Sequence, residues 1–225
     1  MLILGIDTSG KSGGVTLVEA VDDDFRVLGS SPIAGGTFSA QLVPTVSTLL
    51  EQNNRGLRQI HAFAVVSGPG SFTGLRVGLS AVKGLAEVLE KPIVAVSLLE
   101  ALSSLPPQDG QVVAALDAGR SEIFFGLYEL HSGQAARIRE ALLTDHEFLE
   151  EAGKSSRPVI TSDESVAHKL AAARIEVNFA QRPDSTLVAK IGARKLAAGD
   201  TTSVEALDAN YLRRSDAELF FRGNR

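Results

Sequence analysis

The strongest chemical signature of the sequence lies in one glycine-rich stretch at residues 67–78, which reads Ser-Gly-Pro-Gly-Ser-Phe-Thr-Gly-Leu-Arg-Val-Gly. It follows an apolar run at 62–66, predicted to be a buried strand, and it opens a predicted helix over 73–89. Gly74 and Gly78 lie inside that helix, where a glycine costs about 1 kcal/mol relative to alanine. This cost indicates that something approaches the backbone closely, and we expect either a phosphate or another helix.

An earlier segment, residues 5–12, matches the G-x-x-x-x-G-K-S pattern of P-loop nucleotide-binding proteins. That motif needs a helix directly after the Lys-Ser pair, because the helix N-terminus holds the phosphates. Here Gly13 and Gly14 follow, and then an alternating β-branched run, so we predict a β-hairpin turn. A degraded phosphate loop at 7–10 is the alternative interpretation. The nucleophile-elbow pattern G-x-S-x-G at 10–14 fails for the same reason as the P-loop.

Apolar periodicity divides most of the chain into alternating strands and amphipathic helices. Strands are predicted at 2–6, 13–19, 25–33, 62–66, 92–96, 112–117, 135–142 and 158–161, and helices at 39–52, 73–89, 145–152, 164–173 and 187–198, with another helix starting at 98. In the first helix, Leu42, Val46 and Leu49 lie on one stripe. Ser39 is its predicted N-cap.

The chain contains an internal repeat, in which residues 112–117 echo residues 2–7. Each copy ends in Asp, followed by a polar turn and an alternating strand. Between the copies, residues 105–110 hold two prolines, an acid and a glycine, which indicates a turn or linker. The order β-β-β-α-β-α, found twice, is typical of the RNase H-like lobes of the actin/Hsp70/sugar-kinase (ASKHA) superfamily. We therefore predict an α/β protein of two tandem lobes, 1–104 and 105–225, whose last helix is a candidate for packing back on the first lobe.

Asp7 and Asp117 end the first strand of each predicted lobe. In active kinases of this superfamily such acids handle Mg²⁺ and the attacking hydroxyl, and the alternative is that both cap hairpin turns. They are the weak candidates for a cofactor site. The four histidines, His61, His131, His146 and His168, lie at no metal-ligand spacing. The sequence thus predicts no metal site, no cofactor and no catalytic residue.

The composition is that of an ordinary globular protein, with 44% hydrophobic and 22% charged residues among 225. A net charge of -5 without a long basic run predicts that the chain does not bind nucleic acid on its own. The absence of cysteine excludes disulfides and thiolate chemistry. The apolar N-terminus is too short for a signal peptide or a membrane span, so we expect a cytoplasmic protein without membrane contact.

Over nearly its whole length the sequence resembles the bacterial TsaB family, also called YeaZ. The resemblance rests on blocks at 5–9, 67–78, 83–86, 96–102, 116–124 and 211–218. TsaB-like proteins are paralogues of the TsaD enzyme and pair with it, and with the ATPase TsaE, to attach threonylcarbamoyl to an adenosine of tRNAs that read codons beginning with A. TsaD-like members carry a metal-binding H-x-x-x-H that this sequence lacks.

The resemblance therefore implies a non-catalytic scaffold or activator subunit rather than an enzyme. It implies a heterodimer with a TsaD-type paralogue, a homodimer when the chain is alone, contact with TsaE through the complex, and contact with tRNA only through the complex. It also implies that the pairing face consists of the first two helices of the N-terminal lobe, here 39–52 and 73–89.

On the second of these helices, Gly74, Gly78 and Ala81 form a small-residue strip that is a helix-packing face. Buried in the chain's own core it would be a tight helix–strand contact, and exposed it would be a dimerisation face. The predicted partner-binding residues are Ser39, Leu42, Val46, Leu49, Ser71, Phe72, Thr73, Gly74, Leu75, Arg76, Gly78, Leu79 and Val82. On this prediction Gly78→Leu or Leu79→Asp abolishes pairing and leaves the fold intact.

Three other functions fit parts of the pattern. The first is an ATP-binding or phosphotransferase enzyme that uses Asp7 and Asp117. The second is a glycoprotease-like peptidase, although neither a metal pair nor a nucleophile triad is visible in the sequence. The third is a stand-alone homodimer with an unrelated regulatory role.

Overall fold

A computed structural model describes residues 1–22, 24–105, 109–154, 157–210 and 212. These residues form two compact units, of which unit 1 is Met1–Ala101 with Pro183–Ala209. Of the described residues, unit 2 contains those within Leu102–Arg182 together with Asn210 and Leu212. The two predicted lobes, 1–104 and 105–225, are consecutive along the chain. In the structure, by contrast, residues 183–209 belong to the unit that contains the N-terminus.

Unit 1 is built on a 5-stranded sheet with the order β3-β2-β1-β4-β5. Its strands are β1 Leu2–Asp7, β2 Ser12–Val21, β3 Asp24–Ala34, β4 Ala62–Gly68 and β5 Ile93–Ser97. The first three form antiparallel hairpins, and β4 and β5 run parallel to β1. Every residue of β1 and β4 is buried, as expected for central strands that helices cover on both faces.

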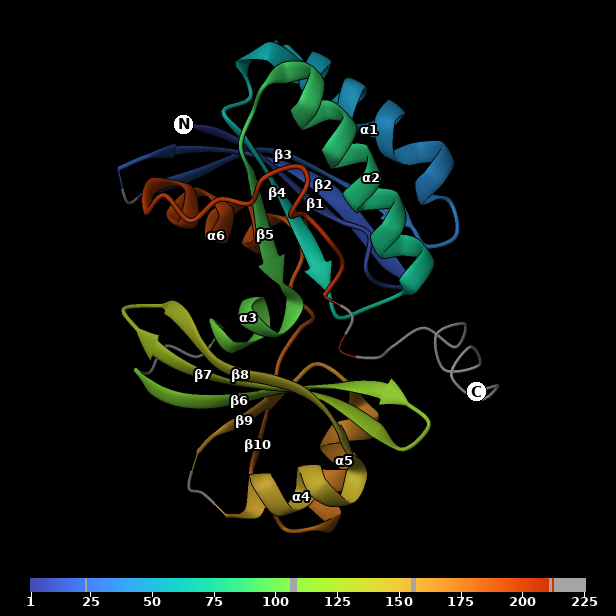
Figure 1. Ribbon diagram of the computed structural model, residues 1–225, viewed down its shortest axis with the longest axis vertical. Helices are drawn as coiled ribbons and strands as arrows, with labels where there is room; N and C mark the ends of the chain where they lie inside the picture. The colour runs from blue at the N-terminus through green and yellow to red at the C-terminus, as the bar shows by residue number, and fades with distance from the viewer. Residues whose placement is uncertain (23, 106–108, 155–156, 211, 213–225) are drawn as a thin grey trace. The chain divides into compact units, whose positions relative to one another are not determined.

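Helices α1, Phe38–Gln52, and α2, Phe72–Leu89, lie side by side over one face of this sheet, and α6, Ser185–Ala197, covers the other (Figure 1). Glycines allow α6 to come close. A Cβ atom added to Gly5 of β1 would lie within 3.0 Å of the Ser185 carbonyl oxygen, and one added to Gly192 would lie as near to Ala64 of β4. The same unit holds the short helix η1, Leu57–Gln59, and the start of α3, Leu98–Ser103.

Unit 2 repeats this topology, because its 5-stranded sheet has the order β10-β9-β6-β7-β8. The elements are β6 Gly110–Gly119, β7 Glu122–His131, β8 Gln134–Thr144, α4 Asp145–Gly153, β9 Val159–Thr161, α5 Glu164–Ala172 and β10 Val177–Phe179. Phe125, Phe148 and Leu170 are central members of its core. The two antiparallel hairpins and the two parallel strands occur in the same places as in unit 1. The predicted pair of RNase H-like α/β folds is therefore confirmed.

Most predicted elements agree with the structure to within a few residues, and the differences have local causes. The predicted N-cap of α1 is wrong, because the helix begins at Phe38 and Thr37 precedes it. The Thr37 hydroxyl donates a hydrogen bond to the Ala34 carbonyl instead of capping the helix. The strand β10 and the helix η1 were not predicted, since each has 3 residues and no periodicity to detect.

Among the described residues, no helix is both long enough and apolar enough to cross a bilayer. Of the sequence block at 211–218, the structure describes Leu212.

Candidate functional site

Three glycines of the 67–78 block, Gly70, Gly74 and Gly78, are explained by the turn between β1 and β2, which packs directly on the start of α2. Thr8 and Ser9 of this turn occupy the space that side chains would need. An added Cβ atom would lie within 3.0 Å of Ser9 at Gly70, of the Thr8 carbonyl oxygen at Gly74, and of the Thr8 hydroxyl oxygen at Gly78. The prediction that a phosphate or a second helix approaches this backbone is therefore wrong, because its close neighbour is the chain's own first hairpin turn.

The two acids at the ends of β1 and β6 hold their hairpin turns in the same way. Asp7 accepts a hydrogen bond from the Ser9 N–H at 2.7 Å, and Asp117 accepts one from the Gly119 N–H at 2.7 Å. Each carboxylate also accepts a bond from a serine hydroxyl, Ser9 for Asp7 and Ser165 for Asp117. The interpretation that both acids cap turns is confirmed.

The four histidines are exposed and belong to separate segments. Nδ1 of His61 accepts a hydrogen bond from the Leu2 N–H at 3.0 Å. In the part of the chain that the structure describes, no three side chains of His, Asp or Glu gather as a metal ion would require.

The predicted partner-binding residues fall into two classes. The buried class consists of Leu42, Val46, Leu49, Gly74, Leu75, Gly78, Leu79 and Val82, and the exposed class consists of Ser39, Ser71, Phe72, Thr73 and Arg76. Leu79 is 5% exposed and Val82 is fully buried. The expectation that Leu79→Asp or Gly78→Leu leaves the fold intact is therefore wrong, since both would disrupt the packing of α2 inside unit 1.

All of the exposed class except Ser71 line a groove between α1 and α2 with a volume of about 530 Å³, as does Leu42 of the buried class. The groove is lined by Phe38, Ser39, Leu42, Val43, Phe72, Thr73, Arg76, Val77, Ser80 and Ala81. The predicted partner-binding residues missed Phe38, Val43, Val77, Ser80 and Ala81. The signal that could have found two of them is an apolar residue on the polar side of an amphipathic helix, as at Val43 and Val77.

This groove exposes apolar side chains beside a single cation. Val43 is 59% exposed and Phe72 is 39% exposed. The guanidinium of Arg76, one turn after Phe72, stacks 3.8 Å from the centre of the Phe72 ring. Large apolar side chains in a surface groove are typical of a protein-binding surface, and nothing in the lining resembles a set of catalytic groups.

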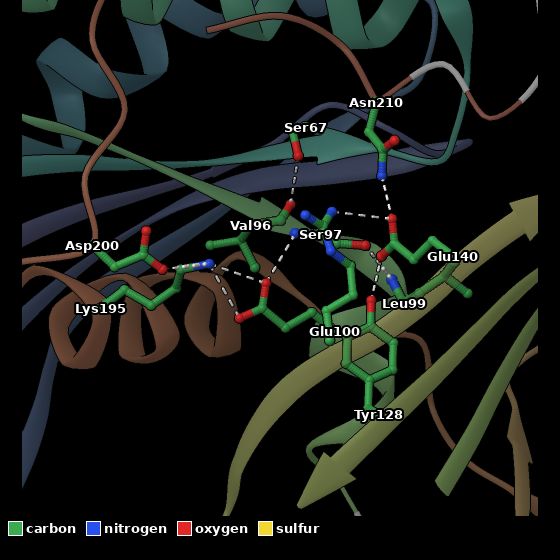
Figure 2. A network of polar contacts seen from close by, with 11 residues as sticks. Ser67, Val96, Ser97, Leu99, Glu100, Tyr128, Glu140, Lys195, Asp200 and Asn210 are labelled. Carbon is green, nitrogen blue, oxygen red and sulfur yellow. Dashed lines mark hydrogen bonds and ion pairs between the residues drawn. The ribbon is translucent and has the colours of Figure 1, made fainter. Parts of the chain in front are cut away.

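A separate polar cluster of unit 1 surrounds Glu100 of α3 (Figure 2). Lys195 of α6 lies 3.3 Å from both carboxylate oxygens of Glu100 and 3.2 Å from Asp200. The Ser97 N–H also donates to Glu100 at 3.4 Å. Burial raises the pKa of Glu100, and Lys195 offsets part of this effect. Since all these groups are engaged with one another, the cluster joins α3 to α6 rather than forming a ligand site.

Unit 2 has its own buried carboxylate, Glu140 of β8, also drawn in Figure 2. It accepts hydrogen bonds from the hydroxyl of Tyr128 and the amide of Asn210, and Arg137 lies 3.7 Å away. This network ties the chain at Asn210 to the sheet of unit 2.

Comparison with known proteins identifies the family of this chain. Residues 32–203 match the family model TsaD, described as tRNA N6-adenosine threonylcarbamoyltransferase. The tRNA threonylcarbamoyladenosine biosynthesis protein TsaB of Bacillus subtilis is 32% identical over 164 residues, which are 71% of this chain and 69% of that protein. The chain belongs to the TsaB family. The match to the TsaD model fits a paralogue relationship between the two families.

Two further TsaB-family comparisons extend the match. TsaB of Haemophilus influenzae is 32% identical over 56% of this chain and 52% of its own length. A solved structure from Pseudomonas aeruginosa, described as an uncharacterized protein with similarity to peptidase YEAZ, is 26% identical with a TM-score of 0.77. That alignment covers 94% of this chain and 99% of the other. The TsaB-family fold is thus present nearly from end to end.

Proposed function

We propose that this chain is a subunit of the machinery that makes threonylcarbamoyladenosine in tRNA, and that it binds a TsaD-type transferase subunit instead of catalysing the reaction itself. Membership of the TsaB family supports the biosynthetic role. The observation that carries the binding role is the α1/α2 groove, because the most family-specific block of sequence forms one of its walls. Exposed apolar residues at Val43 and Phe72 need a partner to leave water.

The division between buried and exposed residues specifies which side chains of α1 and α2 are available to contact the partner. Leu75, Leu79 and Val82 hold α2 on its sheet, and the outward side chains of both helices meet the partner. The partner-binding set of this proposal is therefore Ser39, Val43, Phe72, Thr73, Arg76 and Val77. Gly74 and Gly78 contribute indirectly, because they let α2 lie close to the β1–β2 turn.

The non-catalytic assignment is part of the same proposal. Asp7 and Asp117, the acids that a phosphotransferase of this fold would use, accept turn hydrogen bonds instead. Catalysis then belongs to the TsaD-type partner, and a TsaE-type ATPase joins through the complex. We further propose a homodimer when the chain is alone, tRNA contact only through the complex, and a cytoplasmic location.

The proposal is tested by size-exclusion chromatography with light scattering, on this chain alone and mixed with the TsaD-type protein of the same organism. We expect a stable heterodimer for the unchanged chain and its loss on Val43→Asp, which places a charge in the groove. Val88→Asp is the matched control, because Val88 is 81% exposed on α2 but does not line the groove. Circular dichroism checks that both variants are folded.

Threonylcarbamoylation of tRNA by the reconstituted components gives the functional readout. Activity that needs this chain and is lost with Val43→Asp but not Val88→Asp would support the scaffold role. A chain that ignores the TsaD-type protein and binds ATP tightly alone would overturn the proposal in favour of a phosphotransferase.

A further inference from the structure

Contacts within the chain explain two of the glycines of α2 and leave Gly84 unexplained. Gly74 and Gly78 are buried against Thr8 of the β1–β2 turn, which fills the space that a side chain would need. Gly84 is exposed, and no atom of the described residues lies within 4 Å of a Cβ atom added to it. Its backbone is helical, a conformation that alanine adopts more readily than glycine does. The fold of the described chain therefore does not need a glycine at this position.

The glycine at position 84 weakens the helix that contains it. Glycine loses more backbone freedom on folding than alanine does, and it leaves the helix backbone open to water. Gly84 does not end the helix, because α2 continues to Leu89 and the left-handed residue of its C-cap is Glu90. A residue that lowers stability without a neighbour in the described chain is expected where another molecule comes close to the backbone.

Gly84 lies on the side of α2 that faces the groove. Thr73, Val77 and Ser80 line the groove at intervals of four and three residues along the helix. Gly84 follows Ser80 after a further interval of four, and residues at such intervals share one side of a helix. The lined part of α2 is thus followed, on the same side, by a position at which the backbone carries no side chain.

We infer that Gly84 belongs to the partner-binding face, because atoms of the TsaD-type subunit take the space that a Cβ atom of residue 84 would occupy. This inference rests on the proposed function and adds to it a residue that sets how closely the partner approaches α2. The distance between packed helices depends on the side chains at their contact, and a position without a side chain allows the nearest approach. Binding, and not folding, then explains the glycine.

The test compares stability with affinity in the variants Gly84→Ala and Gly84→Leu. Urea unfolding of the chain alone gives its stability, and titration with the TsaD-type protein gives the heterodimer Kd. Sedimentation equilibrium gives the homodimer Kd. Gly56→Ala is the matched control, because Gly56 is also exposed with no described atom within 4 Å of an added Cβ. It precedes η1 and lies outside α1 and α2.

We expect both Gly84 variants to unfold at a higher urea concentration than the unchanged chain, because alanine and leucine are better helix formers than glycine. The same variants should bind the TsaD-type protein more weakly, by about tenfold for alanine and by more for leucine, because the added atoms overpack the contact. Gly56→Ala should bind as the unchanged chain does. A residue with a purely structural role would not combine higher stability with lower affinity.

Three results would overturn the inference and leave the proposed function standing. The first is an unchanged heterodimer Kd in both Gly84 variants while Val43→Asp abolishes pairing. The second is a weaker homodimer with an unchanged heterodimer, which would assign the position to a second copy of the chain. The third is a less stable Gly84→Ala chain, which would show that another part of the same chain fills this space. If the unchanged chain and the TsaD-type protein do not associate at all, the proposed function is overturned and this inference with it.

Discussion

At residue scale, the fit between α2 and the β1–β2 turn depends on the missing side chains of Gly74 and Gly78. The two glycines meet different atoms of the same residue: Gly74 faces the carbonyl oxygen of Thr8, and Gly78 faces its hydroxyl oxygen. A backbone atom cannot be removed by mutation, but a hydroxyl can. The two positions therefore separate a clash that can be relieved from one that cannot.

We expect Gly78→Ala to destabilise the protein by about 1–3 kcal/mol through overpacking. Thr8→Ala should restore much of that loss, because it removes the hydroxyl oxygen in the way. Gly74→Ala should be destabilising without rescue by Thr8→Ala. Urea unfolding of the single and double variants, arranged as mutant cycles, measures both couplings.

Gly84 provides the control for this experiment, since it lies on the same helix with no atom within 4 Å of an added Cβ. Gly84→Ala should stabilise the protein by about 0.5–1 kcal/mol, as helix propensity predicts. Equal effects at Gly78 and Gly84 would contradict the packing explanation.

The opposite pKa shifts of two glutamates give a pH prediction. The raised pKa of Glu100 means that the folded protein holds this proton more tightly than the unfolded chain. The stability that Glu100 contributes is complete below about pH 4.5 and is lost as the pH rises through its raised pKa. Glu100→Gln should therefore become more stable relative to the unchanged chain as the pH rises from 4 to about 7, in urea unfolding across that range.

Glu147 is the matched comparison, because hydrogen bonds from the backbone and side chain of Thr144 lower its pKa. Its contribution to stability is present above pH 4.5 and is lost as the pH falls through the lowered pKa. Glu147→Gln should thus lose stability relative to the unchanged chain as the pH rises from about 3 to about 5, and urea unfolding of this variant is measured across that lower range. Slopes of the same sign for the two variants would contradict the assigned causes.

At element scale, the sequence predicts the strands and hairpins best where a segment of the chain is repeated. The repeated run ending in Asp7 and Asp117 located the hairpins of both units, and the structure gives them the same strand order. The neighbour of the α2 glycines could not be predicted, because periodicity shows which face of a helix is buried but not what covers it. For the same reason the apolar stripe predicts Leu79 as a partner-binding residue, whereas Leu79 is buried inside unit 1.

Helix α6 has an N-cap residue, Asp184, which the structure identifies. Asp184 accepts hydrogen bonds at 3.0 Å from the N–H groups of Thr186 and Leu187, so the helix begins at Ser185, before the predicted residue 187. Because α6 covers β1 and β4, its cap supports the whole sheet of unit 1. Asp184→Ala should cost about 1 kcal/mol of unfolding free energy, and Asp184→Asn much less. A difference smaller than about 0.3 kcal/mol between these two variants in urea unfolding would contradict the capping role.

At the scale of the whole molecule, the proposed partner should affect the two units unequally. The groove belongs to unit 1, and a ligand that binds only the folded state adds about 2.7 kcal/mol of stability at 100 times its Kd. Amide hydrogen exchange reports such an effect segment by segment. We expect the TsaD-type protein to slow exchange in the first halves of α1 and α2 and to leave α4 and α5 of unit 2 unchanged.

The Val43→Asp variant gives this experiment its reference, because its amides should exchange equally with and without the TsaD-type protein. Slower exchange centred on α4 and α5 would place the partner on unit 2 and remove the role of the groove. Slower exchange over α1 and α2 in both the unchanged chain and Val43→Asp would support the α1/α2 groove as the binding site. It would also show that the apolar side chain of Val43 is not the source of the affinity. The pattern of protection therefore tests the location of the interface independently of the activity of the assembled complex.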